Sequence, residues 1–182
     1  VPALIKAALA HVQFETIHPF LDGNGRLGRL LITFILCVEG ILQEPLLYLS
    51  LYFKKNKNDY YKHLQYVRET GDWEEWLHFF LKGVIETANQ AVDTVRNVLK
   101  LLNEDRKKIE GIGRAAASTL TVHHYILRAP ITDSKKIEMN CDLSLPTVNS
   151  ALKNLLSLNI VKEITGYSRN KIYVYSQYLK IM

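Results

Sequence analysis

The chain has 182 residues and a formal net charge of +5, with 48% hydrophobic and 23% charged residues. This apolar fraction excludes chain-wide disorder, and 9 Gly and 5 Pro exclude a collagen-like or linker-dominated chain. The longest strongly apolar run, 27–38, is interrupted by Gly28 and Arg29 and is too short to span a bilayer. The length therefore fits one ordinary domain or two small ones.

The two cysteines, Cys37 and Cys141, are too few and too far apart for a disulfide scaffold or a zinc site. The chain begins at Val1, and no basic-then-apolar leader follows it. We therefore expect a cytoplasmic protein with reduced thiols and no membrane partner.

Helical patterns dominate the first two thirds of the chain, so we expect a mainly α fold. Apolar residues recur at a helical period from 3 to 17, and Pro19 predicts that this helix stops at His18. The residues Asp, Gly, Asn and Gly within 21–25 predict a loop. Later helices are expected, with breaks at Glu44-Pro45 and Gly71-Asp72, over 25–39, 46–53, 59–69 and 73–109.

Gly111 and Gly113 predict a hinge between a helical core, 1–112, and a small module, 113–182. The module's patterns predict three helices and then two β-like runs, over 115–127, 133–139, 144–158, 160–165 and 171–175. Three helices followed by a hairpin is the order of a winged helix-turn-helix. The core holds 14 Lys+Arg and 14 Asp+Glu, and the module 9 and 4, so the whole positive excess lies in the module.

The densest chemistry lies in 18–29, His-Pro-Phe-Leu-Asp-Gly-Asn-Gly-Arg-Leu-Gly-Arg. Gly23 and Gly25 permit close backbone approach at the start of a helix, where free N–H groups and the dipole attract phosphate. Arg26 and Arg29 are three residues apart and project from one side of the first turn, which suits a polyphosphate.

Two more residues complete this constellation. Asp22 is a single carboxylate at the loop, and one carboxylate with substrate phosphates is a common way to hold Mg²⁺. His18 ends the preceding helix across the loop, where a neutral imidazole can take a proton from a hydroxyl. Each residue alone is ordinary in a turn, but together they place a base, a metal ligand and phosphate clamps within twelve residues.

This stretch matches the motif of Fic-domain proteins, H-x-F-x-[D/E]-G-N-G-R-x-x-R, at all eight specified positions. The segments 46–53, Tyr60-Tyr61 and Gly71-Asp-Trp73 also resemble those that follow the motif in bacterial Fic proteins with a C-terminal winged helix. The resemblance implies a bacterial nucleotidyltransferase that transfers AMP from ATP to a Ser, Thr or Tyr hydroxyl of a target protein (AMPylation).

The resemblance also implies residue roles. His18 would be the catalytic base that deprotonates the target hydroxyl, and Asp22 would hold Mg²⁺. Binding of ATP and its phosphates would fall to Gly23, Asn24, Gly25, Arg26, Leu27, Gly28 and Arg29. In the kinase-like Doc branch a Lys replaces Gly25, so Gly25 favours AMP transfer.

Tyr60 and Tyr61 are candidates for a nucleoside pocket, because aromatic rings can stack on a base. The alternative, that at least one packs in the core, has equal weight. His11 shares a helical face with His18 and is expected to pack. We expect structural or surface roles for the remaining histidines, His63, His78, His123 and His124.

The inhibitory pattern [S/T]-x-x-x-E-[G/N] of many Fic proteins has no convincing copy, because Met139 follows the matching spacing of 134–138. In the related bacterial proteins the inhibitory helix, the target-docking flap and the early core helices precede the motif. Only 17 residues precede His18. We therefore expect an N-terminally incomplete core with weakened, unregulated ATP binding and little or no activity.

A winged helix-turn-helix most often binds DNA. The candidate contacts are polar residues of the recognition helix and basic residues of the wing: Thr147, Asn149, Ser150, Lys153, Asn154, Arg169 and Lys171. The alternative is protein contact or homodimerisation, because Lys153 is the only basic residue of that helix. Two functions stay open: an adenylyltransferase with an accessory module, or a DNA-binding transcriptional regulator whose Fic core senses nucleotide.

Overall fold

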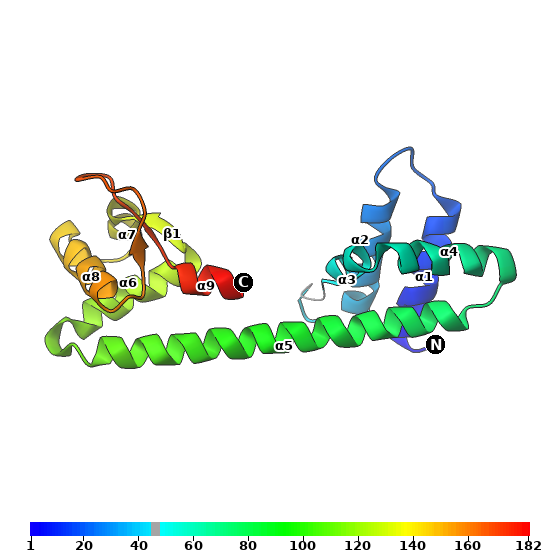
Figure 1. The fold of residues 1–182 in the computed structure, drawn as a ribbon, viewed down its shortest axis with the longest axis horizontal. Coiled ribbons are helices and arrows are strands. Elements are labelled where there is room, and N and C mark those ends of the chain that lie inside the picture. The colour runs from blue at the N-terminus through cyan, green and yellow to red at the C-terminus, as the bar shows by residue number, and fades with distance from the viewer. Residues whose placement is uncertain (45–47) are drawn as a thin grey trace. The chain divides into compact units, whose positions relative to one another are not determined.

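The computed structural model describes residues 1–44 and 48–182. Pro45, the second residue of the predicted break at Glu44-Pro45, therefore lies outside the described residues. So do 46–47, the first two residues of the helix expected over 46–53. The chain packs as two compact units, Val1–Asp93 and Thr94–Met182 (Figure 1). Each unit has its own hydrophobic core. Within the described ranges, no helix is both long and apolar enough to cross a membrane.

The first unit is built from helices, which confirms the mainly α prediction. Its elements are α1 (Ala3–Ile17), α2 (Asn24–Val38), α3 (Leu49–Lys55), α4 (Lys57–Thr70) and the first part of α5 (Glu74–Glu110). Helices α1 and α2 pack closely against each other through small and aliphatic side chains, among them Ala8, Val12, Ile32 and Leu36. Trp76 of α5 is wholly buried, and its Nε1 donates to the Ala8 carbonyl at 3.0 Å.

Two helix ends follow the local sequence as predicted. His18 caps α1 in the left-handed conformation, and its N–H donates to the Phe14 carbonyl. Pro19 disfavours a helical conformation in the residue before it, which explains this stop. Gly71 ends α4 with a φ of +71°, and the Asp72 carboxylate then accepts from the Glu74 N–H at 3.0 Å.

The second unit combines short helices with a small antiparallel sheet. After the end of α5 come η1 (Gly113–Ala115), α6 (Ala116–Arg128), β1 (Ile131–Asp133), α7 (Ser134–Asn140), α8 (Leu145–Ser157), β2 (Lys162–Glu163), β3 (Ile172–Val174) and α9 (Ser176–Ile181). The strand order is β1-β3-β2, with Val174 opposite both Ile131 and Lys162. The three predicted helices and the hairpin are present; β1 and α9 were not predicted. The winged helix-turn-helix assignment stays a prediction.

The packing divides the chain at residues 93 and 94, whereas the glycines had suggested 112 and 113. The physical reason is that Leu101 and Ile109 of α5 are buried in the second core. Gly111 and Gly113 mark the end of a helix, but the last turns of that helix already pack with the module.

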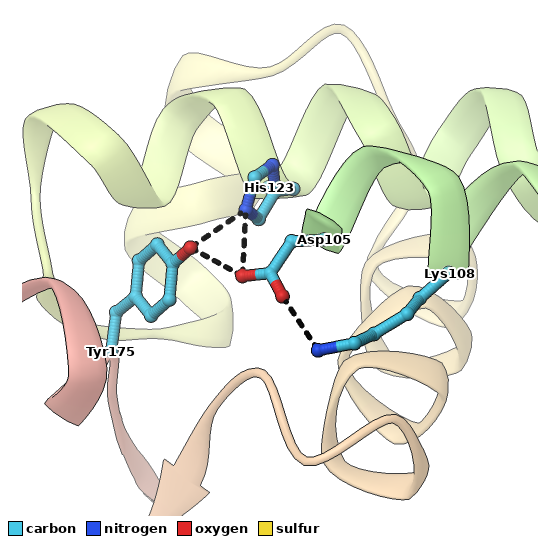
Figure 2. A network of polar contacts seen from close by, with 4 residues as sticks. All are labelled: Asp105, Lys108, His123 and Tyr175. Carbon is cyan, nitrogen blue, oxygen red and sulfur yellow. Dashed lines mark hydrogen bonds and ion pairs between the residues drawn. The ribbon is translucent and has the colours of Figure 1, made fainter. Parts of the chain in front are cut away.

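A buried polar network ties α5 to α6 and to the residue after β3 (Figure 2). Asp105 is wholly buried; one of its carboxylate oxygens accepts from the Tyr175 hydroxyl, and the other lies 3.1 Å from the Lys108 Nζ. His123 Nε2 lies 3.9 Å from the first oxygen and 3.4 Å from the Tyr175 hydroxyl. Burial lowers the pKa of His123, and the charge of Asp105 opposes this shift.

Candidate active site

The side chain of Asn24 bridges the backbone of the loop between α1 and α2. Asn24 is only 2% exposed; its Oδ1 accepts from the Phe20 N–H at 3.0 Å, and its Nδ2 donates to the Phe20 carbonyl. Gly23 adopts a φ of +83°, a conformation that glycine reaches without strain. The side chain of Asn24 thus shapes the loop, which leaves its backbone N–H as the group that can meet a phosphate.

The N-terminus of α2 is open to an anion. No side chain of a described residue caps this end of the helix, so its free N–H groups and positive dipole end can bind phosphate. Arg26 is exposed, with Nη2 3.7 Å from a carboxylate oxygen of Asp22, which is exposed too. Such a surface pair contributes little to stability, so Arg26 can exchange Asp22 for a phosphate at small cost. Leu27 points to solvent, and Gly28 is buried against α1.

His18 is exposed at the end of α1, on the same loop as Asp22. Its φ of +49° is uncommon for a residue with a side chain. Backbone strain of this kind gathers at functional sites, where surrounding contacts fix it. An exposed imidazole at this position can accept a proton from a hydroxyl group.

Arg29 joins the motif to a groove of about 470 Å³ that also has Tyr60 and Tyr61 in its wall. Tyr60 is buried, and its hydroxyl lies 2.9 Å from His11 Nε2. Tyr61 is 57% exposed and meets Tyr60 edge-on, with ring centroids 5.1 Å apart. The alternative that at least one of the two packs in the core is therefore confirmed for Tyr60, and Tyr61 remains open to a base.

His11 packs in the core, as expected, against the rings of Phe53 and Trp76. Burial lowers the pKa of His11 to about 4, so the ring is neutral at neutral pH. Among the described residues, nothing pairs with its Nδ1. The other histidines have structural or surface positions too: His63 packs on Phe79, and His123 belongs to the Asp105 network.

Glu15 was not identified from the sequence. Its side chain lies on the buried face of α1, and only 7% of the residue is exposed. Burial raises its pKa, against the opposing charges of His18, Arg29 and Arg68. A usable signal existed, because Glu15 lies four residues after His11 and three after Val12 on the apolar face of the predicted helix.

A divalent cation would have few protein ligands here. No cluster of three or more His, Cys, Asp or Glu side chains occurs in the part of the chain that the structure describes. The Asp22 side chain is 95% exposed, and one of its oxygens already accepts the Gly23 N–H at 2.6 Å. Among the described residues, the other oxygen meets only the Arg26 guanidinium, at 3.7 Å. An exposed carboxylate oxygen of this kind fits Mg²⁺ that takes its other ligands from substrate phosphates and water.

The structure separates the candidate DNA contacts of the second unit into three groups. Asn149, Arg169 and Lys171 line one groove of about 560 Å³, together with Lys135. Ser150 and Lys153 are exposed on α8 outside that lining. The others make contacts within the unit: Thr147 hydrogen-bonds Ser144 at 2.9 Å, and Asn154 donates to Thr119 at 3.1 Å.

Residues 1–36, which contain α1, this loop and most of α2, match the model of the Fic/DOC family. The chain is 54% identical over 37 residues to a probable protein adenylyltransferase of Aquifex aeolicus, a match that covers 20% of this chain and 12% of the relative. Two relatives called protein adenylyltransferase Fic are similar over longer stretches. The one from Culex quinquefasciatus is 30% identical over 123 residues (63% of this chain, 23% of the relative), and the one from Drosophila yakuba 40% over 73 (40% and 13%).

The chain is thus similar to Fic-domain proteins, and the match to the family model lies in its first 36 residues. The matches span less than a quarter of the length of these relatives.

Proposed function

We propose that this chain is the motif-bearing part of a protein adenylyltransferase, which transfers AMP from ATP to a Ser, Thr or Tyr hydroxyl of a target protein. The observation that carries the proposal is the loop geometry. An uncapped helix N-terminus with Arg26 lies on the same short loop as an exposed His18, and Arg29 extends the site into the groove with Tyr61. The relatives' names, probable protein adenylyltransferase and protein adenylyltransferase Fic, support the same reaction.

In the proposed reaction, a ring nitrogen of His18 takes the proton of the target hydroxyl. The hydroxyl oxygen forms a bond to the α-phosphorus of ATP, while the bond from that phosphorus to the bridging oxygen of the β-phosphate breaks. Pyrophosphate leaves with the electron pair of the broken bond. The open N–H groups of α2, with Arg26 and Arg29, stabilise the phosphate charge and hold the chain of phosphates in line.

Mg²⁺, held by Asp22 and the phosphates, would neutralise phosphate charge. Gly25 supports AMP transfer over phosphate transfer on steric and electrostatic grounds. A Cβ at this position would lie 3.3 Å from the Arg29 Nη1. A longer, cationic side chain here would compete with Arg29 for the same phosphates and repel its guanidinium.

The test is transfer of label from ATP to protein, with the label on the α-phosphate in one arm and on the γ-phosphate in the other. In the complete adenylyltransferase of which we propose this chain to be a part, we expect α-label on protein, lost in His18→Ala and kept in the control His124→Ala, an exposed histidine of the second unit. Transfer of γ-label would indicate a kinase. Equal α-label from wild type and His18→Ala would overturn the role of His18.

A second candidate function, DNA binding by Thr94–Met182, is favoured by one groove. Asn149, Arg169 and Lys171 share its lining, and this unit carries 14 Lys+Arg against 7 Asp+Glu. Binding through phosphate contacts must weaken steeply with salt. A gel shift should show this salt dependence and lose affinity in Arg169→Ala more than in Lys180→Ala, which lies outside the groove. Binding that ignores salt, or no shift, would overturn it.

A further inference from the structure

The carboxylate of Glu15 lies directly behind the phosphate-binding motif. Its Oε1 is 2.6 Å from the position that a Cβ of Gly28 would take, and 3.9 Å from that of Gly25. The Arg29 Nη1 is 3.3 Å from the same position on Gly25. The carboxylate of α1 and the guanidinium of α2 are therefore both close neighbours of one bare glycine of the motif.

Packing alone does not explain why a carboxylate is buried at position 15. Glu15 is 7% exposed, and its Oε1 has no hydrogen-bond partner among the described residues. A buried oxygen without a partner lowers the stability of a fold. An apolar side chain of similar size would fill the same space without that cost, so the charge itself calls for a role.

The charges around Glu15 indicate what this role is. The guanidinium groups of Arg29 and Arg68 act on its carboxyl group through their fields, as does the His18 imidazole when it is protonated. Arg68 is already engaged elsewhere, because its Nη2 donates to the backbone carbonyl of Glu15 at 2.6 Å and its Nε to Thr16 at 3.3 Å. Of the other two residues, both of which belong to the motif, Arg29 carries the permanent charge.

We propose that Glu15 is a positioning residue, whose buried carboxylate orients the Arg29 guanidinium toward the outer phosphates of ATP. The identity of this ligand rests on the proposed function. Arginine has a long side chain with many rotamers, and a fixed counter-charge behind the guanidinium selects those that face the groove. Gly25 and Gly28 leave the space through which the two charges act on each other.

A double-mutant cycle on the dissociation constant of Mg-ATP tests this role. All variants carry His18→Ala, so that no nucleotide is consumed, and calorimetry extends to millimolar ATP. With Arg29 present, Glu15→Gln should weaken binding about fivefold. In an Arg29→Ala background, the same change should alter binding less than twofold, since no guanidinium remains to orient. Glu39→Gln, an exposed carboxylate just past the other end of α2, should leave the affinity unchanged.

An equal loss with and without Arg29, or no loss in either background, overturns the proposal. If Glu15→Gln does not fold, Glu15→Asp takes its place in the same cycle, because it keeps the charge and shortens its reach. If the cycle shows the expected coupling but the complete protein, with His18 intact, transfers no α-label, the positioning role stands and the proposed function is overturned. A chain that binds no Mg-ATP would overturn both.

Discussion

Each unit of the molecule buries a histidine–tyrosine pair beside a carboxylate, and the two clusters differ in how completely their polar atoms are paired. In the first unit, His11 meets the Tyr60 hydroxyl at 2.9 Å, with Glu15 one helical turn away. In the second unit, His123 meets the Tyr175 hydroxyl at 3.4 Å, and both contact Asp105.

The second cluster is satisfied, because both Asp105 oxygens have partners in Tyr175 and Lys108. The first cluster is not, because His11 Nδ1 and Glu15 Oε1 are buried without a partner in the described structure. Paired polar groups hold a unit together, whereas unpaired ones cost stability. The unpaired cluster is the one that supports the Fic motif, which is where a protein can be expected to trade stability for function.

The sharpest way to break the comparison is to remove the carboxylate of the satisfied cluster. Asp105→Ala leaves Tyr175 and His123 buried without their shared acceptor. The free energy of unfolding should fall by about 3 kcal/mol. Urea denaturation followed by circular dichroism measures this loss. Asp142→Ala, an exposed aspartate of the same unit, is the matched control. A loss no larger than that of the control would contradict a structural role for the network.

The next effect concerns pH, because both histidines have lowered pKa values. The pKa of His11 falls from 6.5 to about 4 on burial, so the unfolded chain binds a proton that the folded chain does not. The stability from this group is full above pH 6.5 and is lost as the pH falls toward 4, by up to about 3 kcal/mol. For His123 the Asp105 charge opposes burial, so its contribution should be smaller.

Urea titrations between pH 4.5 and 7.5 test this difference. His11→Gln should flatten the dependence of stability on pH more than His123→Gln does. His124→Gln, an exposed neighbour, should leave the dependence as in the wild type. Equal slopes for His11→Gln and the wild type would show that the ring of His11 is not kept neutral by burial.

A smaller loss in the free energy of unfolding should follow when the space beside His11 Nδ1 and Glu15 Oε1 is filled. In Gly28→Ala, the new methyl group would lie 2.6 Å from the Glu15 Oε1 and 3.2 Å from the His11 ring. Such overpacking should cost about 2 kcal/mol. Gly111→Ala is the control, because its nearest neighbour would be an ordinary 3.4 Å away. Urea denaturation followed by circular dichroism measures both variants. The fluorescence of Trp73 and Trp76, which lie in the first unit, assigns the loss in Gly28→Ala to that unit.

The smallest effect has the opposite sign. Glu15→Met replaces the unpaired carboxylate by an apolar side chain of similar length. It should raise the free energy of unfolding by about 1 kcal/mol, while binding of Mg-ATP weakens. The same change in the satisfied cluster, Asp105→Leu, should destabilise. A destabilised Glu15→Met would show that the carboxylate has a stabilising partner after all.

The sequence predicted those features that a few neighbouring residues decide. Pro19 ends α1, Gly71 ends α4, and the glycines of 21–25 make the motif loop. Features that depend on tertiary packing were beyond it. Whether Tyr60 or Tyr61 faces the core depends on where His11 lies. Strand β1 has only three residues, and each pairs with a residue of β3 that lies more than 38 positions away in the sequence.

Two side chains show the same limit within the site. Asn24 was assigned to phosphate binding, yet its side chain turns back to the backbone of Phe20. Glu15 was overlooked because a carboxylate next to Thr16 and before a loop looks like an ordinary surface residue, although it falls on the apolar face of the predicted helix, and the packing of α1 on α2 shows its burial. The unit boundary at 93 and 94 likewise follows from which core receives Leu101.

The two hydrogen bonds between the Asn24 side chain and the Phe20 backbone have a consequence for the thermodynamics of phosphate binding. Fixing the backbone of a flexible residue costs about 1–2 kcal/mol in conformational entropy. Because Asn24 satisfies both backbone groups of Phe20 without any ligand, the loop is already ordered when the chain folds. The entropy cost of ordering the loop is therefore incurred when the chain folds. Binding of a phosphate at the N-terminus of α2 does not carry this cost, so the cost does not offset the binding enthalpy.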